Sequence, residues 1–222
     1  CFQINVFILF LFSMKNLVLV DEKEIALIER VNSVFLEKGM KRVTMDDMAK
    51  ELNVSKKTLY KYVKNRKELV MKSTFFHVQR DQLKVKEIEA KNLNPIIENH
   101  ELAKFVIETI ANVNPSVHYD LENYFPESWK LLNEYFQGFV FESLHNNLLR
   151  GQKEGVYRAD FNAEIIAKVF ANKIDMIFDA GLFPTEKFNF KDVYLEYLHY
   201  HLRAIVSEES LSILRELDFK KL

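Results

Sequence analysis

The stretch that decides the fold is TMDDMAKELNVSKKTLYKYV, residues 44–63. It predicts two short helices separated by a tight turn at residues 53–55. Thr44 and Ser55 are residue types whose side chains cap the free amides at the start of a helix. The pattern indicates a helix-turn-helix, in which the second helix, here residues 55–62, enters the DNA major groove.

The residues of this stretch divide into an inner and an outer set. Those that two crossing helices would bury are Met48, Ala49, Leu52, Val54 and Leu59. Those expected on or near the groove-facing side, where side chains reach base edges, are Lys56, Lys57, Thr58 and Lys61. The hydroxyls of Tyr60 and Tyr62 are expected to donate to phosphates.

Positive charge is concentrated around the same stretch. Residues 41–67 hold nine lysines and arginines against three acids, an excess of six in a chain whose formal net charge is -1. Such segregation places positive potential where a phosphate backbone would lie. Lysines that merely solvate an exposed helix face are the alternative, and the coincidence with the turn pattern favours DNA binding.

The composition fits a folded protein. The 222 residues are 48% apolar and include only five glycines and four prolines, which leaves little room for linkers. The single cysteine, at position 1, excludes a disulfide framework, a cysteine zinc site and a CxxC redox motif. This is compatible with the cytoplasm, where we expect the protein to act.

Helical periodicity continues through the rest of the chain. Apolar residues recur at intervals of three and four, and no convincing period-two strand or internal repeat is found. Beyond the stretch above, helices are expected near residues 24–38, 66–88, 102–110, 131–150, 163–180, 191–206 and 211–217. The mixed, aromatic segment 116–128 favours no assignment. The fold class is therefore all-α, with a small amino-terminal head and a larger helical body.

The first thirteen residues, CFQINVFILFLFS, are apolar but too short to span a bilayer, and no basic leader precedes them. We expect residues 1–13 to lie upstream of a start at Met14. A short membrane-touching or protein-docking leader is the alternative. The expected domains are then a DNA-binding head over residues 14–69 and a body over residues 70–222, without stable membrane association.

Residues 24–70 resemble the amino-terminal domain of the TetR family of bacterial transcriptional regulators. The recurring pattern of that family is a helix ending in Gly, a Thr-capped helix, a Val-Ser turn, then Leu-Tyr and a basic residue before Leu. It is matched by Gly39, Thr44, Met48, Ala49, Val54, Ser55, Leu59, Tyr60, Arg66 and Leu69. The chain departs from the pattern with Asn53 for the turn glycine, Val63 for an aromatic residue and Arg66 for a lysine.

The resemblance implies roles for individual residues of the head. Thr44, Tyr60 and Arg66 would hold phosphates, and the basic residues of the second helix, with Thr58, would read or approach bases. Packing within the head is the alternative role for Tyr60. The family implies a sequence-specific regulator, which we expect to be a repressor that a ligand releases from double-stranded operator DNA.

The resemblance also implies a helical body that forms a homodimer and often encloses a small apolar or aromatic effector. The expected dimer pair is residues 163–180 with residues 191–206. Candidate ligand-binding residues are the aromatic side chains that cluster in sequence: Phe105, Tyr119, Tyr124, Trp129, Tyr135, Phe136 and Phe139. Packing in an ordinary core is the alternative for this cluster.

Signatures of enzymes are weak, so we expect no catalytic residue, no metal site and no cofactor. The sequence contains no GxSxG, no HExxH and no glycine-rich phosphate loop. His199 and His201 are two apart and point to different faces of a helix. His77 and Asp81 are four apart, and a solvent-facing pair is expected. The rival function is a helical dimeric module that binds protein or a surface and does not read DNA.

Overall fold

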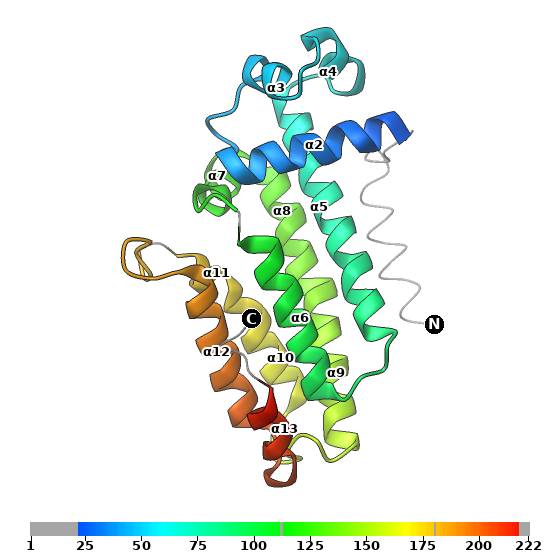
Figure 1. Cartoon of the computed structure of the whole chain (residues 1–222), viewed down its shortest axis with the longest axis vertical. Coiled ribbons are helices and arrows are strands. Elements are labelled where there is room, and N and C mark those ends of the chain that lie inside the picture. The colour runs from blue at the N-terminus through cyan, green and yellow to red at the C-terminus, as the bar shows by residue number, and fades with distance from the viewer. Residues whose placement is uncertain (1–21, 112, 180, 218–222) are drawn as a thin grey trace.

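The computed structural model describes residues 22–111, 113–179 and 181–217. The expected leader and the start at Met14 lie outside the described residues. Within them the chain is all-helical, as predicted, and its only extended pairing is an isolated bridge between Tyr157 and Val206. Figure 1 shows a small head on one end of an elongated helical body.

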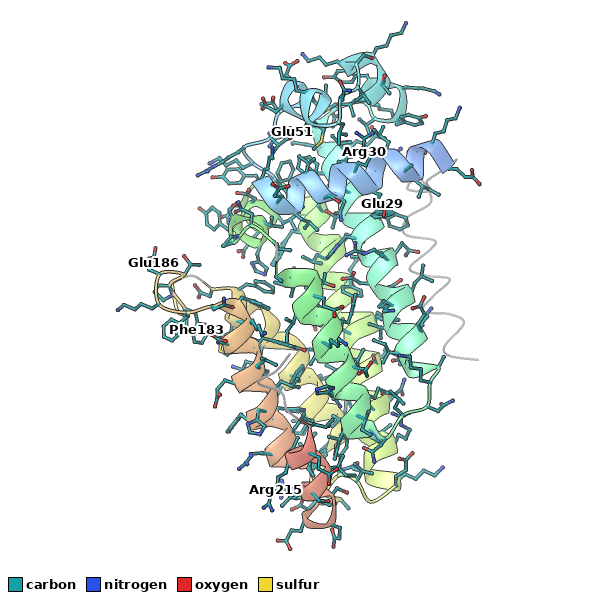
Figure 2. All side chains as sticks on the ribbon, in the orientation of Figure 1. Glu29, Arg30, Glu51, Phe183, Glu186 and Arg215 are labelled. Atoms are coloured by element: carbon teal, nitrogen blue, oxygen red, sulfur yellow. The ribbon has the colours of Figure 1, made fainter. Side chains whose placement is uncertain are left out.

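The head consists of α2 (Glu22–Lys38), α3 (Met45–Glu51) and α4 (Lys56–Tyr62), and it sits on the start of the long helix α5 (Arg66–Glu89). A buried ion pair joins α2 to α5, with Lys72 Nζ 2.5 Å from Glu24 Oε1. The guanidinium of Arg30 donates to the Leu52 carbonyl at the end of α3, and Figure 2 shows Arg30 on α2 beneath that helix. Helix α2 is thereby joined both to α5 and to the end of α3.

The body continues α5 with helices that run largely along the long axis of the molecule (Figure 1). They are α6 (Pro95–Ile110), α7 (Ser116–Tyr124), α8 (Pro126–Glu134), η1 (Tyr135–Val140), α9 (Phe141–Lys153), α10 (Ala163–Asn172), α11 (Ile174–Phe178), α12 (Phe190–Ile205), η2 (Glu208–Ser210) and α13 (Leu211–Glu216). Helices α7 and α8 occupy the segment for which the sequence pattern favoured no assignment.

Local chemistry explains where the helices of the head begin. The side chains of Thr44, Ser55 and Asn65 accept hydrogen bonds from backbone amides of α3, α4 and α5. These amides lack partners inside a helix, so a capping oxygen stabilises the helix start. The two starts predicted from Thr44 and Ser55 are confirmed, and Asn65 begins α5 in the same way.

Two long helices predicted from periodicity are interrupted. The helix expected over residues 131–150 contains the π-helix η1, and the helix expected over residues 163–180 is divided at Lys173. A π-helical turn has one more residue than an α-helical turn, so it changes the direction of the side chains that follow. Both interruptions lie beside the cavity described below.

The buried apolar residues form one cluster in the head and another in the body. The head cluster contains Phe35, Met48, Leu59 and Leu69, and it also includes Val117, Leu121 and Phe125 from the region of α7. The body cluster gathers side chains of α6, α9, α10 and α12. The expected domain boundary at residue 69 stays a prediction, and the head shares part of its core with α7.

Candidate nucleic-acid interface and body cavity

The turn between α3 and α4 is built by specific backbone and capping contacts. Thr44 and Asp47 form a capping box, in which Asp47 N donates to Thr44 Oγ1 at 3.2 Å and Thr44 N donates to Asp47 Oδ2 at 3.0 Å. Asn53 has a φ of +53°, the left-handed conformation that asparagine tolerates well. Ser55 Oγ accepts from Thr58 N at 3.0 Å and begins α4. The predicted helix-turn-helix geometry is present.

One face of α4 is buried and the other is open to solvent. Leu59 is fully buried against Met48 and the rest of the head core. Lys56, Lys57 and Lys61 are exposed, and the Tyr60 side chain is 49% exposed. About half of the Tyr60 surface is thus open to solvent, and its contact with phosphate stays a prediction.

The lysines of α4 differ in their partners. Lys56 Nζ lies 2.5 Å from Asp46 Oδ1 and links α4 to α3. Lys61 Nζ lies 5.0 Å from the centre of the Tyr62 ring. Lys57 makes no ion pair or hydrogen bond with any part of the chain that the structure describes. Its charge is thus available to a ligand outside the chain.

The remaining residues predicted to touch DNA border α4. Thr44 is exposed at the start of α3, and Thr58 lies half-buried with its hydroxyl 2.8 Å from Ser55 Oγ. Tyr62 is half-buried and packs against the head core. Arg66 is also half-buried, and its Nη2 donates to the carbonyls of Met40 and Lys41, the latter at 2.6 Å. Arg66 therefore holds the α2–α3 turn, and its contact with phosphate stays a prediction.

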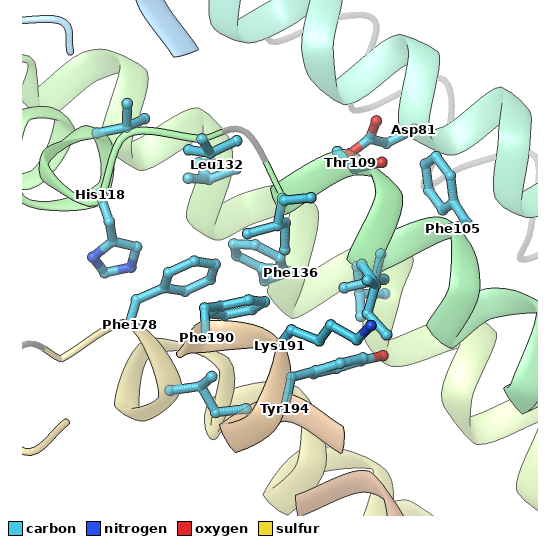
Figure 3. A pocket seen from close by; sticks show the side chains of 18 of the residues that line it. Asp81, Phe105, Thr109, His118, Leu132, Phe136, Phe178, Phe190, Lys191 and Tyr194 are labelled. Atoms are coloured by element: carbon cyan, nitrogen blue, oxygen red, sulfur yellow. The ribbon is translucent and has the colours of Figure 1, made fainter. Parts of the chain in front are cut away.

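The body encloses a cavity of about 560 Å³, a volume typical of small-molecule sites. Most of its lining comes from α5, α6, α7, η1, α11 and α12, together with the loop between α11 and α12. Helices α2, α8, α9 and α10 contribute one or two residues each. Figure 3 shows Phe136, Phe178 and Phe190 around the open space. The Phe178 and Phe190 rings stack with centres 4.5 Å apart. The lining is therefore largely aromatic and apolar.

The structure brings together four of the seven aromatic side chains predicted to bind a ligand. Those that line the cavity are Phe105, Tyr135, Phe136 and Phe139. Tyr119, Tyr124 and Trp129 are absent from the lining. The Tyr119 side chain is 58% exposed, the Tyr124 hydroxyl accepts from Lys41 Nζ at 2.6 Å, and Trp129 packs against the head core. Clustering in sequence gave no indication of which helix face each ring would occupy.

The prediction that His77 and Asp81 form a solvent-facing pair is wrong. Both line the cavity, with His77 Nε2 3.4 Å from Asp81 Oδ2, and their side chains are only 20% and 11% exposed. Burial lowers the pKa of His77 and raises the pKa of Asp81. The spacing of four along α5 correctly indicated the contact, but periodicity did not reveal that α6 and η1 cover this face.

Helix α7 lies between the cavity and the head. Val117, His118 and Leu121 line the cavity, and Val117 and Leu121 also belong to the head core. From the same helix, Asp120 Oδ2 accepts from the backbone amide of Lys41 at 2.8 Å. A change in the cavity that moved α7 would therefore reach the α2–α3 turn directly.

The described residues contain no group of three or more His, Cys, Asp or Glu side chains that would hold a metal ion. His201 packs against Phe170, with ring centres 4.5 Å apart, and burial lowers its pKa to about 4. Among the same residues, no helix combines the length and the apolar character needed to cross a bilayer.

Comparison with known proteins identifies the head. Residues 27–71 match the family model described as bacterial regulatory proteins of the tetR family. This range includes the α3–turn–α4 unit and the start of α5. No curated protein matches the chain.

Solved structures share the fold over most of the chain. A transcriptional regulator from Cytophaga hutchinsonii is 14% identical, with a TM-score of 0.67, over 84% of this chain and 100% of that one. SmeT, repressor of the Stenotrophomonas maltophilia multidrug efflux pump SmeDEF, is 14% identical with a TM-score of 0.58, covering 82% and 89%. The repressor FadR of Thermus thermophilus, in complex with lauroyl-CoA, is 18% identical with a TM-score of 0.53, covering 80% and 90%.

Proposed function

Because this chain belongs to the TetR family of bacterial regulatory proteins, we propose that it is a homodimeric repressor that a small apolar effector releases from operator DNA. Regulators of this family are DNA-binding transcription factors and not enzymes. The observation that carries the proposal is the solvent-exposed face of α4. Basic and tyrosine side chains are exposed on this face, and the opposite face of α4 packs into the helix-turn-helix core. The protein would act in the cytoplasm, where its DNA is found.

The head would bind DNA through two sets of contacts. Lys57, Thr58 and Lys61 of α4 would approach base edges in the major groove, and Lys56, Tyr60 and Tyr62 would border them. Thr44 and Arg66 would hold phosphates on either side. Neutralising phosphates with lysine and arginine releases counterions, so the affinity would fall steeply with salt concentration.

A second copy of the chain would cover the face formed by α10 and α12. Ile165 and Val169, one turn apart on α10, are 58% and 48% exposed, and Tyr200 of α12 is 72% exposed. Exposed apolar side chains grouped in this way are typical of protein interfaces. A two-fold pairing of these helices would set two heads at a fixed spacing and would match a palindromic operator.

The effector would act by ordinary linkage. A ligand weakens DNA binding only if it binds the non-binding arrangement of the two heads more tightly. The cavity and the contacts of α7 with the head supply a physical connection for this coupling. Support for the class of function comes from the fold neighbours, which include a repressor crystallised with lauroyl-CoA and a repressor of an efflux pump.

The test is selection of random DNA duplexes by the purified chain at physiological salt, where non-specific binding is weak. We expect enrichment of a palindrome, and a dimer in solution. A folded, dimeric protein, freed of bound ligand, that enriches no sequence would contradict the proposal and support the module that binds protein or a surface.

A further inference from the structure

The cavity has one polar corner, formed by two residues one turn apart on α5. Asp81 is buried, with 8% of the residue exposed, and its neighbour His77 reaches it from the preceding turn. Figure 3 shows the Asp81 carboxylate beside Thr109 and Phe105, at the end of the cavity away from His118. A carboxylate in such a place is costly unless it is well hydrogen-bonded.

This corner is short of hydrogen-bond donors. Asp81 Oδ1 and His77 Nδ1 are buried polar atoms without a hydrogen-bond partner. The nearest cation, Arg80 Nη2, stands 3.8 Å from Asp81 Oδ1, and the Arg80 side chain is 47% exposed and hence largely solvated. The contact with His77 Nε2, at 3.4 Å, is also long for a hydrogen bond.

Several other polar side chains of the lining already have partners. The Thr74 hydroxyl donates to the Val70 carbonyl at 3.0 Å. Asn99 Nδ2 lies 2.8 Å from Asn147 Oδ1, and Asn32 Oδ1 accepts from Ser73 at 3.1 Å. Among the described lining side chains, the fully buried polar atoms without a hydrogen-bond partner belong to Asp81 and His77.

The chemistry of the two unpartnered atoms defines what is missing. Burial lowers the pKa of His77, so the ring is neutral and carries one proton. With that proton on Nε2, facing the Asp81 carboxylate, Nδ1 is an acceptor. Both unpartnered atoms thus accept, and a group with several donors and a positive charge complements them.

The walls around this corner suit the body of such a ligand. Phe105 lies near Asp81 and Phe136 lines the cavity farther along, and aromatic rings bind both apolar groups and cations. The lining also holds one lysine, Lys191 of α12, which is only half-buried. Lys191 as a residue is partly exposed, whereas only 8% of Asp81 is exposed, so the buried charge that most needs a partner is the Asp81 carboxylate.

We propose that the effector is a primary ammonium compound with an aromatic or aliphatic body, whose ammonium group is held by Asp81 and His77. This inference rests on the proposed function, because it names the ligand class of the same cavity. Asp81 and His77 are then the residues that determine specificity, and the aromatic walls supply binding that is largely independent of the end group.

The direct test compares three probes with the same apolar body: 6-phenylhexylamine, 6-phenylhexan-1-ol and 6-phenylhexanoate. Their dissociation constants for the full chain are measured by calorimetry at neutral pH. We expect the amine to bind at least tenfold more tightly than the alcohol or the carboxylate. Equal binding of the three would overturn the proposal. Tightest binding of the carboxylate would also overturn it and would point to Lys191.

Two variants assign the preference to the polar corner. Asp81→Asn keeps the shape and removes the charge, and we expect it to weaken amine binding at least tenfold while alcohol binding changes less than twofold. His77→Phe keeps a ring but removes the acceptor, and a smaller loss for the amine is expected. Asp160→Asn, an exposed change elsewhere, is the matched control. Unchanged amine binding in both corner variants would refute the assignment.

Measuring whether the amine changes the affinity for operator DNA distinguishes failure of this inference from failure of the proposed function. If the amine binds through Asp81 but leaves DNA affinity unchanged, the ligand class stands and the release mechanism fails. If the amine does not bind but another apolar compound releases the DNA, the release mechanism stands and the ligand class is wrong.

Discussion

At the scale of single residues, Gly39 shows how closely the head rests on the body. Its φ is +85°, and a Cβ added there would lie 2.7 Å from Ser116 Oγ. Gly39→Ala therefore combines an unfavourable backbone conformation with a steric clash. We expect the free energy of unfolding to fall by about 1–3 kcal/mol, measured by urea denaturation.

Gly138→Ala is the matched control for that change. Gly138 lies in η1 with a negative φ, and a Cβ there would meet nothing within 4 Å. We expect its free energy of unfolding to change little or to rise slightly. A loss as large as that of Gly39→Ala would contradict the account.

His201 gives the stability a pH dependence of defined sign. Its pKa in the folded protein is about 4, against 6.5 without burial. As the pH falls below 6.5, His201 binds a proton in the unfolded chain but not in the folded chain. The free energy of unfolding therefore declines between pH 6.5 and 4.

We expect this histidine to account for a loss on the order of 2 kcal/mol between pH 7.5 and pH 5. His201→Phe should remove that part of the loss in urea denaturation at the two pH values. Burial also lowers the pKa values of His77 and His100. The free energy of unfolding of the variant should therefore still fall with pH, but less steeply than that of the unchanged protein. An identical pH dependence in the variant would refute the role of His201.

At the scale of elements, α3 depends on its capping box. Thr44→Ala removes the hydroxyl that accepts from Asp47 N, and α3 has only seven residues. We expect a loss of about 1 kcal/mol in the free energy of unfolding, together with weaker DNA binding because α3 supports α4. Ser33→Ala, within the exposed face of α2, is the control. Equal effects of the two changes would argue against the cap.

The helix starts of the head were predictable because capping is local. Thr44, Ser55 and Asn65 each accept from an amide of the first turn that follows, so a few neighbouring letters contain the whole interaction. Asn53 likewise adopts its left-handed backbone within one turn. The family resemblance of the head rests on the same local contacts, and its fold was therefore well predicted.

The cavity was less predictable because its walls come from distant parts of the chain. Phe178 stacks on Phe190 across a loop, and His118 stacks on Phe178, with ring centres 5.3 Å apart. These pairings depend on the turn at Lys173 and on the angle between α7 and α11, and no periodic pattern encodes them. The burial of Asp81 depends in the same way on the helices that cover α5.

At the scale of the whole molecule, α7 would connect the proposed effector to the proposed DNA-binding face. Asp120 fixes the Lys41 amide, and its neighbours on α7 line the cavity. We expect Asp120→Asn to weaken this connection, so that saturating 6-phenylhexylamine would change operator affinity by a smaller factor than in the unchanged protein. Glu122→Gln, exposed on the same helix, is the control. An undiminished factor in Asp120→Asn would rule out this route.

The proposed dimer depends on the exposed apolar face of α10. We expect Ile165→Glu combined with Val169→Glu to give a folded monomer by analytical ultracentrifugation, because it places four charges in a two-fold interface that excludes water. Leu83→Glu changes an apolar residue that is 63% exposed on α5 and should leave the dimer intact. A double variant that remains dimeric would place the interface elsewhere.

The central claim is that α4 reads DNA, and it is tested most directly by the affinity for the selected operator. Fluorescence anisotropy would compare the unchanged chain with Lys57→Glu, on the open face of α4, and Lys104→Glu, an equal change of charge on the body. We expect Lys57→Glu to weaken binding by about tenfold to a hundredfold, as the loss of a groove contact does, and Lys104→Glu to weaken it less than threefold. Equal losses from the two variants would contradict the claim.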